Sequence, residues 1–195
     1  MSRSDSYHHG DLRKALLDEA FTVLRRGGAD AVSLRAVAGA IGVSPSAAYH
    51  HFPDKDALLM AVGDLCAEVF DRHMIDAALS VRSDSDTAAI DRFMALGRAY
   101  IDFAQEDPHL FRHLFGALCA GMSPIASGVS PAFDTLLGAL DTLAQRGLLR
   151  PGAREGLELV AWSCVHGFAV LAAAGLVPAD MRDDLLASLC RITTT

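Results

Sequence analysis

Apolar residues recur every three or four positions along nearly the whole chain, the spacing that places them on one face of an α-helix. No convincing run of strict apolar and polar alternation, bounded by hairpin turns, points to strands. The pattern therefore predicts an all-α fold of about nine helices. Gly27 and Gly28 end the first helix, expected over residues 11–26, whose apolar stripe consists of Leu12, Leu16, Ala20 and Val23.

Two short helices should follow, separated by a glycine. Ser33 is a good N-cap for the second helix, and Gly42 permits the left-handed backbone that a tight turn needs. Ser44 and Pro45 have the order of an N-cap and a first helical residue, so they begin a third helix of about two turns. Phe52 ends that helix, because the residue before a proline disfavours helical backbone.

The rest of the chain carries the pattern of a helical body. A long helix is expected over residues 55–79, and Gly, Ser and Pro between Gly121 and Pro131 predict a loop. The remaining helices are marked by apolar positions within residues 90–104, 110–118, 133–143, 154–174 and 179–192.

Net charge divides the chain into two parts. Of the formal net charge of −7, residues 1–55 carry seven basic and six acidic groups, or +1, and the remainder carries −8. Only the first part is therefore suited to a polyanion. No apolar stretch is long enough to cross a membrane and the first ten residues are polar, so we expect a cytoplasmic protein with no membrane partner.

Enzyme chemistry finds no support in the sequence. Glu106 and His109 have the Glu-x-x-His spacing of di-iron bundles, and His113 follows four residues later, but the second motif that such a site needs is missing. The four cysteines form no CxxC pair, and no G-x-S-x-G, P-loop or G-x-G-x-x-G motif occurs. We therefore expect no catalytic residue, no metal and no cofactor.

The three helices of the first part fit a helix-turn-helix, in which one helix enters the major groove of DNA and the preceding helix supports it. Ala48 and Phe52 can pack back onto the first helix. The outward side chains of the third helix would then be short hydroxyls, a methyl, a phenol and imidazoles, which can reach phosphates or base edges. These residues are Ser44, Ser46, Ala47, Tyr49, His50 and His51.

Residues 11–60 resemble the DNA-binding domain of the TetR family of bacterial transcriptional regulators. The resemblance is carried by the segment VSLRAVAGAIGVSPSAAYHHFPDKDALL from Val32, with its turn glycine, its Tyr49-x-x-Phe52 and its Lys55. The segment AWSCVHGFAVL from Ala161 resembles the Trp-His-Gly type of TetR C-terminal domain. The resemblance implies a dimer that binds a palindromic operator through the third helix and releases it when a small molecule enters the C-terminal domain.

Residues 1–55 are accordingly expected to form the DNA-binding domain, and residues 56–195 the ligand-sensing and dimerisation domain. Lys55 lies at a helix N-terminus, where its charge and the free N–H groups attract phosphate. For Ser33, the alternative is that it only caps the second helix. For Tyr49 and His50, the alternative is that they are ordinary surface residues. The candidate DNA-binding residues are Ser33, Arg35, Ser44, Pro45, Ser46, Ala47, Tyr49, His50, His51 and Lys55.

An effector site is predicted in the C-terminal part, because Trp162 and His166 are four residues apart on one helical face. Other aromatic and apolar residues can complete a cavity with few polar groups, although plain core packing explains the same pattern. The effector would be small and apolar or aromatic. The candidate ligand-binding residues are Met94, Tyr100, Phe111, Phe115, Trp162, His166 and Phe168.

The last two helices are expected to form the homodimer interface. The predicted interface residues are Leu157, Val160, Val165, Leu171, Leu185, Leu186 and Leu189.

Two functions remain open at this point. The first is a transcriptional regulator; we favour a repressor, although no residue distinguishes a repressor from an activator. The second is a helical small-molecule-binding protein or enzyme without DNA recognition. The charge of +1 on residues 1–55 is weak for a polyanion binder and favours the second function slightly.

Overall fold

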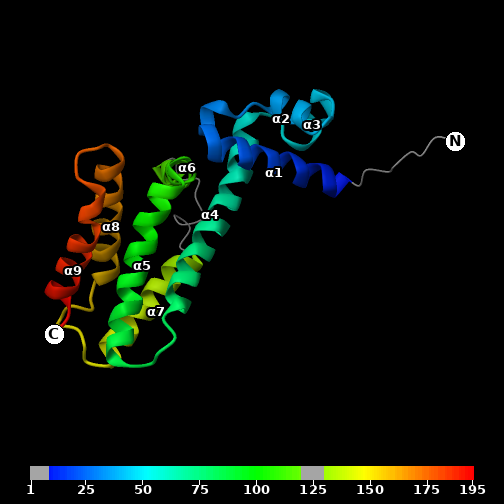
Figure 1. Ribbon diagram of the computed structural model, residues 1–195. Coiled ribbons are helices and arrows are strands. Elements are labelled where there is room, and N and C mark those ends of the chain that lie inside the picture. Colours follow the sequence, from blue (N-terminus) through cyan, green and yellow to red (C-terminus); the bar gives the residue numbers. More distant parts are fainter. Residues whose placement is uncertain (1–8, 120–129) are drawn as a thin grey trace. The chain divides into compact units, whose positions relative to one another are not determined.

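The computed structural model describes residues 9–119 and 130–195, and these form nine α-helices and two short 3-10 helices. Figure 1 shows the α-helices with their labels. The predicted all-α fold is confirmed. Most of the loop expected between Gly121 and Pro131 lies outside the described residues. In chain order the helices are α1 His9–Gly27, η1 Ala29–Ala31, α2 Leu34–Ala40, α3 Pro45–His51, α4 Lys55–Ser80, α5 Asp86–Glu106, α6 Pro108–Cys119, α7 Pro131–Gln145, α8 Leu157–Ala173, η2 Ala179–Met181 and α9 Arg182–Thr193.

Packing divides the chain into two units. Among the described residues, the N-terminal unit consists of 9–67 and 109–119, and the C-terminal unit of 68–108 and 130–195. Helix α6 thus belongs with α1 to α3, and α4 contributes to both units. This division concerns packing, whereas the expected boundary at residue 55 concerns function and stays a prediction.

At the start of several helices, a side chain accepts a hydrogen bond from one of the first free N–H groups. The Ser85 side chain accepts a hydrogen bond from the Ala88 N–H at the start of α5, and the Ser130 side chain accepts one from Phe133 at the start of α7. Asp54 caps α4 in the same way, its carboxylate accepting from the Ala57 N–H at 2.8 Å. Local sequence therefore fixes these helix starts.

Two predicted helices begin later than expected. Residues 154–156 form turns, and α8 starts at Leu157, because Gly156 adopts a left-handed φ of 69° that a helix cannot contain. Residues 179–181 form the 3-10 helix η2, and α9 starts at Arg182. Residues 154–156 are Arg, Glu and Gly, so no apolar residue there marks where α8 begins.

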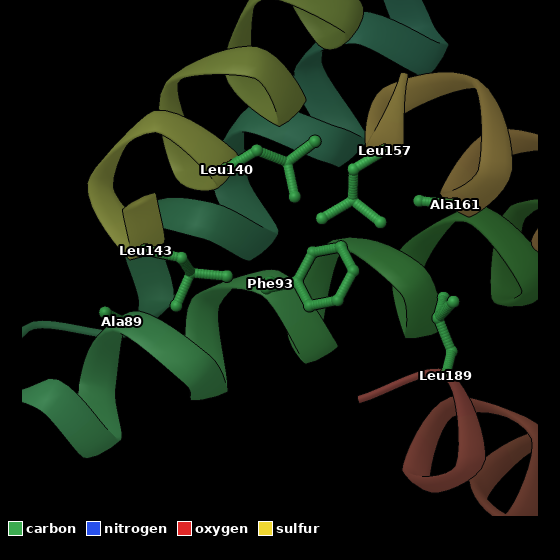
Figure 2. Packing of buried hydrophobic residues seen from close by; sticks show 7 residues of the cluster. All are labelled: Ala89, Phe93, Leu140, Leu143, Leu157, Ala161 and Leu189. Carbon is green, nitrogen blue, oxygen red and sulfur yellow. The ribbon is translucent and has the colours of Figure 1, made fainter. Parts of the chain in front are cut away.

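Helices α5, α7, α8 and α9 bury a common core in the C-terminal unit, as Figure 2 shows. Each fully buried leucine there stabilises the fold by about 1.5–3 kcal/mol. Gly97 of α5 lets α9 approach closely, since a Cβ atom at that position would lie 2.5 Å from Leu186 Cδ2. The core residues drawn are Ala89, Phe93, Leu140, Leu143, Leu157, Ala161 and Leu189.

Candidate functional site

The turn between α2 and α3 is built around Gly42, which has a φ of 75°. The Val43 N–H donates to the Ala38 carbonyl at 2.9 Å, and the Gly42 N–H donates to the Gly39 carbonyl at 3.1 Å. This pair of bonds is a Schellman motif, which satisfies the last carbonyls of a helix and needs left-handed backbone at the glycine. The turn thereby sets the direction in which α3 leaves α2.

Helix α3 is anchored at its start and at its end. The Ser44 hydroxyl accepts a hydrogen bond from the Ala47 N–H at 3.2 Å, and Pro45 occupies the first turn. On the inner side Ala48 and Phe52 are buried, and the Arg13 guanidinium of α1 lies 5.2 Å from the centre of the Phe52 ring. The predicted inward face of α3 is confirmed, and the sequence pattern had not signalled the role of Arg13.

Most of the candidate DNA-binding residues are exposed to solvent. Seven of the ten are exposed and the other three, Ala47, His51 and Lys55, are partly buried. Tyr49 exposes 44% of its surface, a large value for an aromatic side chain, so the ring is not part of the core. The exposed residues are Ser33, Arg35, Ser44, Pro45, Ser46, Tyr49 and His50.

Ser33 and Lys55 differ from the sequence expectation in their local contacts. Ser33 occupies the N-cap position of α2, but its hydroxyl makes no capping hydrogen bond, so the prediction of a side-chain cap is wrong. Its extended backbone, with φ −136°, positions its carbonyl to accept from the Val37 N–H at 2.8 Å instead. The Lys55 Nζ atom donates to the Asp30 carbonyl at 3.5 Å and so ties the start of α4 to η1.

Three of the predicted effector residues form a hydrogen-bonded network in the C-terminal unit. The Trp162 indole N–H donates to the Tyr100 hydroxyl at 3.1 Å, and the Tyr100 hydroxyl lies 2.8 Å from His166 Nδ1. A neutral imidazole protonated on Nε2 satisfies all three groups, because the phenol then donates to Nδ1. Burial lowers the pKa of His166 and raises that of Tyr100, so both side chains favour their neutral forms.

Aromatic rings that the prediction did not include pack against this network. Phe70 of α4 meets the Tyr100 ring edge to face at 5.5 Å, and Phe133 of α7 meets the Trp162 ring at 6.1 Å. The spacing of apolar residues along one helix could not pair either phenylalanine with a ring about 30 positions away. The network thus lies among aromatic side chains from four helices.

The other predicted effector residues are distributed over both units. Met94 of α5 is partly buried and Phe168 of α8 is buried, both in the C-terminal unit. Phe111 and Phe115 of α6 belong to the N-terminal unit, where their ring centres lie 4.7 Å apart. A single site made of all seven residues therefore stays a prediction.

The surface of α8 and α9 corrects the predicted interface residues. Leu157, Val165, Leu186 and Leu189 are buried inside the protomer, so these four cannot meet a partner. The large apolar residues exposed on the same two helices include Val160 and Leu171 of the predicted set, together with three residues that the prediction did not include. They are Leu159, Val160, Val170, Leu171 and Ile192.

His109 and His113 make ordinary hydrogen bonds within the N-terminal unit. The Arg112 guanidinium donates to His109 Nδ1 at 2.7 Å, and His113 Nε2 lies 2.9 Å from the Leu59 carbonyl, to which it donates. Over residues 9–119 and 130–195, no group of three or more His, Cys, Asp or Glu residues is arranged to hold a metal ion. None of the described helices combines the length and apolar character that a bilayer crossing requires.

Comparison with known families gives two matches, which cover separate parts of the chain. Residues 16–62 match the family described as bacterial regulatory proteins of the tetR family. Residues 93–193, more than half of the chain, match the family described as the tetracyclin repressor-like C-terminal domain. No protein of curated function matches the sequence significantly.

Solved structures of similar fold cover nearly the whole chain. A protein of unknown function from Rhodococcus sp. RHA1 is 30% identical, with a TM-score of 0.77, over 98% of this chain and 100% of the other. A TetR family transcription regulator from Marinobacter aquaeolei VT8 is 21% identical, with a TM-score of 0.63, over 93% and 95% of the two chains. A transcriptional regulator from Saccharomonospora viridis, solved in complex with choline, is 18% identical, with a TM-score of 0.74, over 95% and 99%.

Proposed function

Because this chain belongs to the TetR family of bacterial regulatory proteins, a family of transcription regulators and not of enzymes, we propose that it is a ligand-responsive repressor. Two copies bind a palindromic operator, and a small apolar or aromatic effector releases them. Residues 1–55 read the DNA, and residues 56–195 sense the effector and form the dimer.

The observation that carries this proposal is the two-sided character of α3. Its inner residues Ala48 and Phe52 are buried, whereas hydroxyl, phenol and imidazole side chains on the other side are exposed. Side chains of these kinds can donate to phosphates and reach base edges in a major groove. In this proposal Tyr49 and His50 make the central contacts, and Arg35 and Lys55 position the domain on the backbone.

A homodimer is supported by the exposed apolar residues of α8 and α9. Leu159, Val160, Val170 and Leu171 give α8 a second apolar face beside the one that packs in the core. Twofold pairing of two such helices from each protomer would form a four-helix interface. Two DNA-binding domains would then be held about one helical turn of DNA apart, or a multiple of that spacing.

Effector binding is assigned to the network of Tyr100, Trp162 and His166. Segment 161–171 is of the Trp-His-Gly type in this proposal, with Trp162 and His166 supplying polar atoms among aromatic rings. Sites for small molecules commonly combine apolar walls with a few such groups. The structure of a regulator of similar fold with choline supports a small-molecule site in this chain, without indicating which molecule it takes.

Titration of the purified protein with DNA from its own promoter region tests the proposal. We expect a complex from which unrelated DNA displaces the promoter DNA poorly. The complex should weaken as the salt concentration rises, because contacts to phosphates release counterions. Tyr49→Ala should weaken the complex, and Tyr100→Phe, a change in the C-terminal unit, should leave it unchanged. No complex even at low salt would refute DNA recognition and favour a helical small-molecule-binding protein.

A further inference from the structure

The N-terminal unit contains a cavity of about 480 Å³, and no residue of α3 or of the Tyr100 network lines it. Its walls are the end of α1 with η1, the first half of α4, and α6. Cavities of roughly 300–1,000 Å³ are the usual size of small-molecule sites. The cavity is therefore large enough for an organic ligand of its own.

Glycines create much of the space in this cavity. Gly63 lies inside α4 and Gly116 inside α6, where glycine destabilises a helix relative to alanine. A Cβ atom at Gly116 would have no neighbour within 4 Å, and one at Gly63 would meet only His113 Nε2, at 3.7 Å. Neither glycine is required by close packing of the backbone, so both leave room in the cavity.

The two sides of the cavity carry opposite charge. Arg112, with His109 and His113, lines it from α6, whereas Asp30 of η1 and Asp56 of α4 line it from the other elements. The His113 ring is held in place by its hydrogen bond to the Leu59 carbonyl, and the Arg112 guanidinium is directed by its bond to His109 Nδ1. A ligand between these walls meets a cationic group on one side and carboxylates on the other.

Apolar side chains line the cavity as well. Leu59 and Met60 of α4 and Leu114 of α6 line the cavity, and Met60 exposes 52% of its surface. Burial of an exposed apolar side chain by a ligand is favourable in proportion to the area removed from water. The cavity thus combines a cationic pole, an anionic pole and an apolar surface.

We propose that this cavity is a second small-molecule site, and that it takes a zwitterion of the amino-acid class with an apolar side chain. The ligand carboxylate would face Arg112 on α6, and its ammonium group would face Asp30 and Asp56. Its side chain would lie on Leu59, Met60 and Leu114. A ligand with only one charge would be attracted by only one of the two poles.

Occupancy of the cavity would act on the DNA-binding residues through η1 and α4. Helix η1 ends two residues before Ser33, which precedes α2. The Lys55 ammonium donates to the Asp30 carbonyl and so links η1 to the start of α4. Lys55 itself lies three residues after Phe52, the C-cap residue of α3. If the ligand binds the operator-bound protein and the operator-free protein with different affinities, it changes operator affinity by the ratio of those two affinities. This effect on DNA rests on the proposed function, whereas ligand binding itself does not.

Calorimetric titration of the full chain with each of the twenty L-amino acids tests the proposal. We expect at least one with an apolar side chain to bind with a Kd of about 1 mM or tighter. Its amine analogue, which lacks the carboxylate, and its carboxylate analogue, which lacks the amine, should each bind at least about tenfold weaker, since each loses one pole. No binding by any amino acid, or equal binding by the analogues, would overturn the inference.

Variants locate the binding in the cavity. Gly116→Leu should weaken it at least about tenfold, because the new side chain occupies the cavity without meeting a close neighbour. Gly138→Leu is the matched control: it also has open space around the new Cβ atom, but it lies on α7 and does not line the cavity. Arg112→Met and Asp56→Asn should each weaken binding as well.

Equal affinity in Gly116→Leu and in the original protein would place the ligand elsewhere and refute the site. Operator binding by the unliganded protein is measured in parallel. If the operator is bound and no amino acid is, this inference fails and the proposed function stands; if an amino acid binds and no operator does, the reverse holds.

Discussion

The turn at Gly42 offers a test in which backbone conformation is separated from packing. Gly39 and Gly42 are both exposed, and a Cβ atom at either position would have no neighbour within 4 Å. Gly39 has ordinary helical backbone in α2, whereas Gly42 has a φ of 75°. Alanine at both positions therefore adds the same side chain in the same kind of space and differs only in the backbone it must adopt.

Opposite effects on stability follow from this difference. Gly39→Ala should raise the free energy of unfolding by about 0.5–1 kcal/mol, because alanine loses less conformational freedom in a helix. Gly42→Ala should lower it by about 1–2 kcal/mol, because left-handed backbone is unfavourable for an L-residue with a Cβ atom. The midpoint of urea unfolding, followed by circular dichroism, measures both changes.

Operator affinity provides a second readout of the same pair. If Gly42→Ala relieves its strain by changing the turn, α3 moves relative to α2, and affinity should fall by up to about tenfold, the equivalent of 1.4 kcal/mol. Gly39→Ala should bind the operator as the original protein does. Equal shifts of both variants in the same direction, or a Gly42→Ala variant as stable as the original, would refute the argument from backbone conformation.

Three further predictions concern the C-terminal unit. Gly167→Leu should shift sedimentation toward the monomer, since Gly167 lies on α8 between the exposed Val160 and Val170 with open space around a new Cβ atom; an unchanged dimer would exclude this face. Asp71→Ala should destabilise the fold by about 1–2 kcal/mol in urea unfolding, because the Asp71 carboxylate accepts hydrogen bonds from the Ala132 N–H and the Ser130 hydroxyl; no loss would make these bonds unimportant. Burial lowers the pKa of His166 in the folded state, so the contribution of this residue to stability is complete above its ordinary pKa of 6.5 and is lost as the pH falls below that value. His166→Gln should therefore flatten the decline of the urea midpoint below pH 6.5. The same decline in the variant and in the original protein would contradict this cause.

The fold was largely predictable because its signals are local. Caps such as Ser44 and Ser130, the turn glycine Gly42 and the spacing of buried residues act within a few positions of where they appear. The start of α8 was misplaced because Arg154 and Glu155 do not mark where the helix begins, whereas the left-handed backbone of Gly156 prevents a helix there.

The faces of α8 could not be assigned from the sequence, because this helix is apolar on more than one side. Leu157 and Val165 pack inward while Val160 and Leu171 are exposed, and spacing alone does not say which stripe belongs to the core. That choice depends on α5, α7 and α9, whose positions are set by tertiary packing.

The network of Tyr100, Trp162 and His166 was predicted only in part, for a related reason. Trp162 and His166 share a helical face and could be paired from their spacing. Tyr100 reaches them from a position more than 60 residues away, and its hydrogen bonds to both could be seen only in the structure.

The central claim is that the exposed face of α3 contacts DNA, and photocrosslinking tests it most directly. A photoreactive benzoylphenylalanine is incorporated in place of Ser46, and in a control variant in place of Ser83, an exposed residue between α4 and α5. Position 46 should crosslink to bases in two half-sites whose centres lie about 10 base pairs apart or a multiple of that, and position 83 should not crosslink. A protein that binds its promoter DNA without crosslinking from position 46 would contradict the account.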